Sequence, residues 1–198
     1  VKLPPRPDSV QARKAGVSVA KIRGDKALLV MLEDDHKTAD LALGIMLRGY
    51  VFSDHKSSPD AAIPAAETHL MVSLPTECEA KFSAIRAVAD GIFFTRDLVS
   101  EPANVLTTTE FADRLESLTV LGLEVEVLEE DSLAALGMWS LLCVGQGSAS
   151  PSKMVVMQWN GGAKGASPLA LVGKGVVFDT GGISLKPAGG MEDMTMDM

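Results

Sequence analysis

The order of apolar and polar residues predicts an α/β chain in which short strands alternate with helices. Residues 17–22 alternate between apolar and polar side chains, and residues 27–32 are continuously apolar, so both are predicted as strands. Residues 38–52 carry apolar side chains at helical spacing, which predicts a helix with Thr38 as its N-cap. The polar, proline-containing stretch 53–64 predicts a loop.

A second strand and helix follow, and then the pattern breaks. Residues 69–74 are predicted as a strand, and residues 76–99 as a helix with one apolar side. Glu101 and Pro102 end that helix, because the residue before a proline disfavours the α conformation and proline has no N–H to donate. We therefore place the boundary between two domains here, residues 1–100 and residues 101–198.

The second half begins with a helix signal and continues with strands. Thr107 is predicted to cap a helix that runs to about Leu118, with Glu110 reaching back in a capping box. A short helix is expected at residues 132–136, and strands at residues 123–128, 154–159 and 169–178. Strands that alternate with helices are typical of βαβ units, so the predicted fold class is α/β with a mainly parallel or mixed sheet.

The composition excludes several classes of protein. With 198 residues, 46% hydrophobic and 22% charged, the chain is expected to be globular. Its net charge of −8 argues against a dedicated nucleic-acid binder. No apolar run reaches the roughly 18 residues of a membrane helix, and the Pro-rich start does not resemble a secretory signal. Cys78 and Cys143 have no metal-type spacing, so we expect neither a disulfide framework nor a structural zinc site. The expected location is the reducing cytoplasm.

Candidate chemistry is concentrated in residues 171–198, where an apolar run leads into glycines, lysine and acidic residues. Lys174 lies inside that apolar run. A buried lysine there would have to be paired with an acidic group, bound to a metal, or neutral through a lowered pKa. The alternative is a lysine at a strand edge whose amine reaches solvent. Asp179 alone is typical of a turn cap, and Asp197 of a solvated surface. Together the two carboxylates and one amine suggest a divalent-cation site, although their spacings match no general metal motif.

Other chemistries have weaker support. The glycine-rich segment 181–190 contains Lys186 but lacks the order of a phosphate-binding loop. The three histidines are scattered without an HExxH pair, and no GxSxG motif is present. Cys78 has glutamate on both sides, which is unlike the electropositive setting of an activated thiolate. Metal-assisted hydrolysis is therefore the leading prediction.

These residues carry a family resemblance. The stretch VGKGVVFDTGGISLKPAGGMEDMTMDM resembles the catalytic signature of the leucyl aminopeptidase family, the cytosolic two-metal exopeptidases. TRDLVSEPANVLTTTEF is similar to the entry into that family's catalytic domain, with Ser100 where the family usually has Asn. LGMWSLLCVGQGS, MVVMQWNGG and GIMLRGYVFSDHKS also resemble family segments. The resemblance implies a partial N-terminal α/β domain with a linker helix over residues 1–100, and the beginning of a larger α/β catalytic domain over residues 101–198.

The resemblance also implies roles for individual residues. Lys174, Asp179 and Asp197 match metal ligands, with Asp179 expected to bridge two ions, either Zn or Mn. Lys186 matches the catalytic lysine that polarises the scissile carbonyl and stabilises the developing oxyanion. Met194 matches a residue that lines the pocket for the N-terminal side chain of the substrate. The implied activity is metal-dependent removal of N-terminal residues from peptides, Leu-like residues preferred, by a cytoplasmic hexamer.

The sequence departs from the family at its end. The family completes its metal pair with a later segment that carries two more carboxylate ligands and a catalytic arginine that holds a bicarbonate, and residues 1–198 do not include it. We therefore expect residues 1–198 alone to be inactive, either as a piece of a longer enzyme or as a truncated form. The alternative functions are a non-catalytic binding or assembly module and, less well supported, a phosphate or nucleotide binder.

Overall fold

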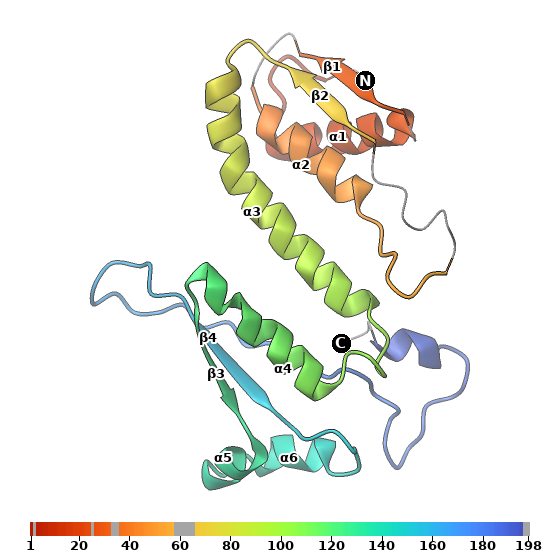
Figure 1. Cartoon of the computed structure of the whole chain (residues 1–198), viewed down its shortest axis with the longest axis vertical. Coiled ribbons are helices and arrows are strands. Elements are labelled where there is room, and N and C mark those ends of the chain that lie inside the picture. The colour runs from red at the N-terminus through yellow and green to blue at the C-terminus, as the bar shows by residue number, and fades with distance from the viewer. Residues whose placement is uncertain (2, 25, 33–35, 58–65, 196–198) are drawn as a thin grey trace. The chain divides into compact units, whose positions relative to one another are not determined.

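The computed structural model describes residues 1, 3–24, 26–32, 36–57 and 66–195. The chain divides into unit 1, Val1–Asp97, and unit 2, Leu98–Met198 (Figure 1). Within the described residues, each unit combines helices with one pair of strands. The α/β class predicted from the sequence is confirmed.

Helix α1 (Ser9–Arg23) begins at a capping box. The backbone N–H of Gln11 donates to Oδ1 of Asp8 at 2.8 Å, and the backbone N–H of Asp8 donates to Oε1 of Gln11 at 3.1 Å. The strand predicted for residues 17–22 is wrong, because a buried stripe with helical spacing outweighs the short alternation of apolar and polar residues. The buried residues of that stripe are Ala12, Ala15, Gly16, Val19 and Ala20.

Two glycines bring α1 into close contact with helix α2 (Thr38–Gly49). Gly16 on α1 faces the backbone of Leu41, and Gly44 on α2 faces the backbone of Arg13. In both places a Cβ atom would overlap a carbonyl oxygen of the other helix, so a glycine is required for this close approach. The buried side chains around the crossing form the core of unit 1: Ala12, Ala15, Val19, Ala20, Leu41 and Ile45.

An ion pair joins the same two helices beside the glycine contact. Nη2 of Arg13 lies 2.9 Å from Oδ1 of Asp40, whose side chain is only 10% exposed. Asp40 also places a negative charge in the first turn of α2, where the helix dipole favours it. The N-cap of α2 is Lys37, in the left-handed conformation, so the predicted cap at Thr38 is wrong and Thr38 is the first helical residue.

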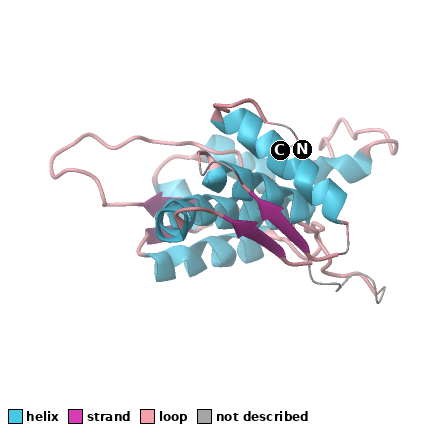
Figure 2. Ribbon diagram, turned by 90° about the horizontal axis from the view of Figure 1, so that it is seen from above, coloured by secondary structure: helices cyan, strands magenta, loops and turns pink. Residues whose placement is uncertain are grey.

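The strands of unit 1, β1 (Leu28–Met31) and β2 (Thr68–Met71), lie side by side in Figure 2. They pair in parallel, and α2 lies in the connection between them. Both strands confirm the predictions made from the apolar runs. The predicted loop is observed for residues 53–57, and residues 58–65 lie outside the described part of the chain.

Helix α3 (Pro75–Ser100) confirms the helix predicted over residues 76–99. Its C-terminal half is anchored by Tyr50, whose hydroxyl donates to Oδ1 of Asp97 at 2.8 Å and whose ring stacks on Phe93 at 5.4 Å between centroids. The helix ends two residues before Pro102, as predicted.

Unit 2 contains an antiparallel pair of strands, β3 (Glu124–Leu128) and β4 (Met154–Gln158). The chain leaves β3 through two short helices, α5 (Glu130–Ala135) and α6 (Trp139–Gly145), which lie at one end of the pair (Figure 1). The chain therefore enters β4 at that same end and runs back. The pair β1 and β2 is parallel and the pair β3 and β4 is antiparallel, in two separate two-stranded sheets. Both directions therefore occur among the described strands, in agreement with the predicted mainly parallel or mixed pairing.

Helix α4 (Thr108–Glu116) starts at the predicted cap and continues into a 3₁₀ turn, η2 (Ser117–Leu121). The hydroxyl of Thr107 accepts a hydrogen bond from the backbone N–H of Glu110 at 3.2 Å. The carboxylate of Glu110 accepts from Arg114 at 2.7 Å, and no return bond of the predicted capping box is found among the described contacts. One half of the box is therefore confirmed.

The strand predicted for residues 169–178 is wrong. These residues form a loop, and the apolar side chains of Leu169, Leu171 and Val172 are 86%, 86% and 98% exposed. An apolar run forms a strand only where a neighbouring strand supplies hydrogen-bond partners. In the described part of unit 2, β3 and β4 pair with each other and neither pairs with this segment.

A buried carboxylate lies at the start of unit 2. The side chain of Glu101 is 4% exposed, and its Oε2 lies 2.8 Å from Nη1 of Arg114. Nε of Arg114 lies 2.7 Å from Oε1 of Glu110 on the same helix. The hydrogen bonds that Arg114 donates to Glu110 and, with a smaller effect, to Glu101 raise the pKa of Arg114 above its ordinary value. Arg114 thus joins the segment that follows α3 to α4.

Replacing Arg114 with methionine is expected to lower the free energy of unfolding by about 1–3 kcal/mol, because the buried carboxylate of Glu101 loses its ion pair. Urea unfolding of unit 2, followed through the fluorescence of Trp139 and Trp159, measures this change. Glu110→Gln is the control, since it removes the more exposed arm of the same network and is expected to cost less than about 1 kcal/mol. Equal losses in the two variants would contradict this account of Glu101.

Candidate metal centre

The loop between β4 and η3 (Met191–Thr195) folds back on itself at Asp179. The backbone N–H of Gly181 donates to Oδ1 of Asp179 at 2.8 Å. Gly181 has a φ of 92°, in the left-handed region that favours glycine, and the backbone N–H of Lys186 donates to the carbonyl of Thr180 at 2.9 Å. This turn returns Lys186 to the carboxylate that precedes it by seven positions.

Lys186 contacts two of the other four predicted site residues, Asp179 and Met194. Nζ of Lys186 lies 3.1 Å from Oδ2 of Asp179 and donates to Sδ of Met194 at 3.0 Å. The side chains of Lys186 and Asp179 are 33% and 37% exposed, so the ion pair lies partly in solvent. Met194 reaches it from η3.

The carboxylate of Asp179 is held in its charged form. The hydrogen bond from Gly181 has the largest effect, followed by the contact with Lys186, and together with the positive charge of Lys174 these lower the pKa of Asp179 below its ordinary value. Asp179 is therefore an ionised carboxylate at neutral pH. Lys174 is close enough to contribute to its electrostatics.

The two remaining predicted site residues are Lys174 and Asp197, and only Lys174 lies among the described residues. Lys174 is exposed and belongs to the loop over residues 169–178 rather than to a buried strand. Its positive charge acts on the carboxylate of Asp179, so the alternatives raised by its apolar surroundings stay open. Asp197 lies outside the described residues, so its predicted place beside Asp179 stays a prediction.

The donor chemistry fits part of a cation site. Within residues 1–195, apart from the gaps, no three His, Cys, Asp or Glu side chains gather into a group that could hold a metal ion. The donors that the loop does supply are the ionised carboxylate of Asp179, a hard oxygen ligand, and the amine of Lys174. Oδ2 of Asp179 already has a positive charge beside it, the ammonium group of Lys186. The loop can therefore contribute an anionic oxygen to a cation.

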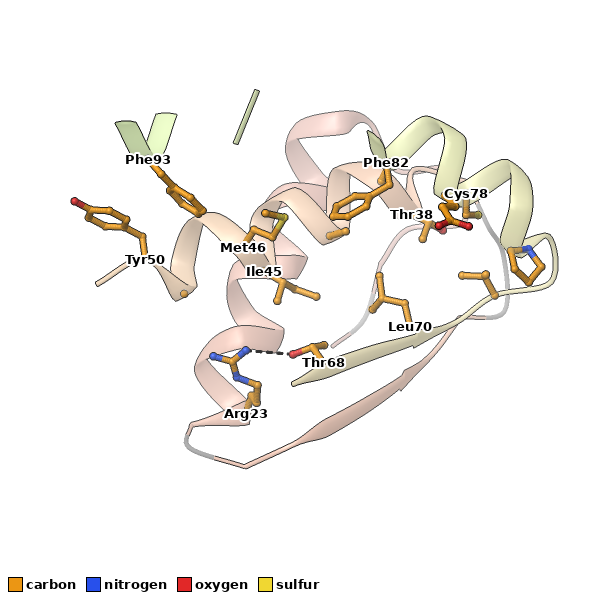
Figure 3. A pocket seen from close by; sticks show the side chains of 16 residues that line it. Arg23, Thr38, Ile45, Met46, Tyr50, Thr68, Leu70, Cys78, Phe82 and Phe93 are labelled. Atoms are coloured by element: carbon orange, nitrogen blue, oxygen red, sulfur yellow. Dashed lines mark hydrogen bonds between the residues drawn. The ribbon is translucent and has the colours of Figure 1, made fainter. Parts of the chain in front are cut away.

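Unit 1 contains a cavity of about 600 Å³ between α2, β2 and α3 that sequence reasoning missed (Figure 3). Its walls are mostly apolar, with Ile45 and Leu70 from α2 and β2 and with Phe82 and Phe93 from α3. At its polar end, Nη1 of Arg23 donates to the hydroxyl of Thr68 at 3.2 Å. The available signal was the pair of phenylalanines on a long helix that buries only Ala89.

Two further findings concern the cysteines and the length of the helices. Cys78 and Cys143 are both free thiols, half-buried and exposed respectively. None of the helices in the described residues combines the length and the apolar character needed to cross a bilayer.

Comparison with known protein families finds a match over residues 93–198, to the catalytic domain of the cytosol aminopeptidase family. A "Probable cytosol aminopeptidase" of Dinoroseobacter shibae is 58% identical over 199 residues, and one of Cereibacter sphaeroides is 54% identical over 198 residues. Each alignment covers 100% of this chain and 40% of the relative. The chain thus spans about two fifths of the length of these relatives.

Solved structures give a similar picture. The bottromycin maturation enzyme BotP in complex with Mn is 30% identical, with a TM-score of 0.76 over 96% of this chain and 41% of that one. The cytosol aminopeptidase from Coxiella burnetii is 24% identical, with a TM-score of 0.76 over 96% of this chain and 40% of that one. The second likeness shows the shared fold.

Proposed function

The chain belongs to the cytosol aminopeptidase family, and from this premise we propose that it supplies part of the catalytic centre of a metal-dependent aminopeptidase. The observation that carries the proposal is the Lys186–Asp179–Met194 cluster, which lies inside the segment that matches the family's catalytic domain. The cluster combines an ionised carboxylate and a primary amine from the loop with an apolar side chain from η3. Peptide substrates with a free N-terminus are the proposed substrates.

Two residues of the loop and one beyond it are proposed to hold the metal ions. Asp179 would bridge two ions, with Lys174 and Asp197 completing this chain's share of the ligands. The chemistry of Asp179 supports the assignment, because its carboxylate is a hard oxygen ligand of the kind that divalent ions take. Bound divalent ions would supply Lewis-acid chemistry, activating a water molecule and polarising the scissile carbonyl. Zn and Mn are the proposed metals, and the structural relative with Mn favours testing Mn first.

The side chains of the cluster supply the remaining steps. The ammonium group of Lys186 would stabilise negative charge as it develops on the carbonyl oxygen of the substrate. Met194 contacts that amine through its sulfur and presents an apolar surface, which suits a Leu-like N-terminal side chain. Lys186 would thus act on the reacting carbonyl, and Met194 on the neighbouring side chain of the substrate.

The wider assignments are proposals that follow from family membership. A cytoplasmic location agrees with the name of the relatives, and a hexamer with bound bicarbonate belongs to the resemblance found in the sequence. Size measurement of the gene product by analytical ultracentrifugation tests the hexamer directly.

The gene product that contains this chain is expected to hydrolyse leucine p-nitroanilide when supplied with Mn²⁺ and to lose that activity on treatment with a chelator. N-acetyl-leucine p-nitroanilide is the matched control, because it lacks the free amine and is expected to react at least ~100-fold more slowly. Absorbance of the released nitroaniline measures both reactions. No turnover with Mn²⁺ or Zn²⁺, or equal rates for the two substrates, would contradict the proposal.

The alternative is a non-catalytic binding or assembly module formed by residues 1–198 alone. Calorimetry that shows two tightly bound metal ions on residues 1–198 would argue against it. Hydrolysis of leucine p-nitroanilide by residues 1–198 would exclude it.

A further inference from the structure

The carboxylate of Asp179 is engaged on both of its oxygens. Oδ1 accepts the hydrogen bond from the backbone N–H of Gly181 at 2.8 Å, and Oδ2 lies 3.1 Å from the ammonium group of Lys186. The first contact is part of the turn and involves a backbone donor. The second is a charge-assisted contact with a side chain that can move.

A divalent cation and the ammonium group of Lys186 compete for the same oxygen. Two positive charges within about 4 Å of each other repel even in a water-like dielectric. The other described partner of the amine, Sδ of Met194 at 3.0 Å, is a neutral and weak acceptor, so it offsets little of that repulsion. A cation that binds Oδ2 therefore has to displace the ammonium group.

We infer that Lys186 is an internal counter-ion that occupies the metal-binding oxygen of Asp179 until a divalent ion displaces it. The inference rests on the proposed function, because it takes Asp179 as a metal ligand. It adds a second task to the proposed catalytic lysine: Lys186 holds the empty site together and weakens metal binding. A neutral residue at position 186 strengthens metal binding while removing the catalytic amine.

The sulfur of Met194 and the backbone of the turn explain why the displaced amine stays close to the site. The hydrogen bond from the N–H of Lys186 to the carbonyl of Thr180, 2.9 Å, involves only backbone atoms and does not depend on the ion pair. A thioether is a poor ligand for a hard ion such as Mn²⁺, so Met194 does not compete for the metal. The amine can therefore exchange its contact with Asp179 for one with another acceptor without leaving the loop.

Mn²⁺ affinity of the gene product that contains this chain tests the inference, with the free ion measured by electron paramagnetic resonance. Lys186→Met is expected to bind Mn²⁺ about 3- to 10-fold more tightly than the unmodified chain, as expected for a partly exposed ion pair and one removed positive charge. Lys186→Gln is expected to behave in the same way. Lys186→Arg keeps the charge and is expected to stay within about twofold of the unmodified chain.

Two further variants separate this inference from the proposed function. Lys164→Met removes a positive charge from an exposed residue elsewhere in unit 2 and is expected to leave the affinity within about twofold. Asp179→Asn is expected to abolish Mn²⁺ binding at the site. The counter-ion role would be overturned if Lys186→Met and Lys186→Gln both bound Mn²⁺ no more tightly than the unmodified protein while binding still depended on Asp179. The proposed function would then remain valid. Binding that is unaffected by Asp179→Asn would overturn the metal assignment itself.

Discussion

Replacing Lys186 with alanine is expected to lower kcat for leucine p-nitroanilide by about 100- to 1,000-fold in the gene product that contains this chain. Removal of one group that stabilises a developing oxyanion typically has an effect of this size. Because the same substitution removes the counter-ion of Asp179, metal binding is expected to become tighter rather than weaker. The loss of rate should therefore persist when Mn²⁺ is saturating.

Steady-state kinetics at saturating Mn²⁺ measure this effect and separate it from metal loss. Lys164→Ala is the matched control, since Lys164 is an exposed lysine of unit 2, and it is expected to keep the kcat of the unmodified enzyme. A kcat for Lys186→Ala that equals that of the control would contradict the catalytic role. So would a defect that excess Mn²⁺ repairs, because Lys186 would then act only through the metal.

Replacing Gly44 with alanine is expected to destabilise unit 1 by about 3 kcal/mol or more. A Cβ at this position would overlap the carbonyl oxygen and the carbonyl carbon of Arg13 on α1, which are backbone atoms that cannot rotate away. The two helices would have to separate, and the small buried side chains around the crossing would lose their packing. Circular dichroism during urea unfolding measures the change.

Gly49 provides a control on the same helix. Nothing lies within 4 Å of a Cβ built at Gly49, and alanine favours the helical conformation over glycine by roughly 1 kcal/mol. Gly49→Ala is therefore expected to be neutral or slightly stabilising. Similar losses in Gly44→Ala and Gly49→Ala would show that the cost comes from the helix itself and not from the contact with α1.

Local sequence signals predicted those elements whose ends are fixed by nearby residues. Thr107 caps α4 by accepting from the N–H of Glu110, and Pro102 accounts for the end of α3. Both effects act within a few positions of the chain, so a single sequence contains them. The capping box of Asp8 and Gln11 is equally local, and it starts α1, the helix that contains residues 17–22.

Elements that depend on distant partners were predicted poorly. The apolar run 169–178 has the composition of a strand, yet no described strand of unit 2 pairs with it. The direction of β4 depends on where α5 and α6 return the chain, which the strand sequence does not encode. Pairing partners and directions are tertiary properties, and strand propensity reflects them only indirectly.

For the candidate site, the sequence identified the residues but not the contacts between them. Lys174, Asp179 and Lys186 were singled out from the sequence, but their roles came from the family resemblance because their spacings match no general motif. The contact between Lys186 and Asp179 depends on the left-handed Gly181, which turns the chain back within seven residues. A pair of glycines in a sequence indicates a turn without specifying which side chains it brings together.

The crossing of α1 and α2 also has a consequence for the order of folding events. Gly16 and Gly44 are 28 positions apart in the chain, whereas each residue of β1 pairs with one 40 positions later. Contacts between nearby positions close smaller loops and form faster. During synthesis, moreover, both helix sequences are complete before the first residue of β2 is added. We therefore expect the helix pair to be the nucleus of unit 1, with the parallel strands completing the unit afterwards.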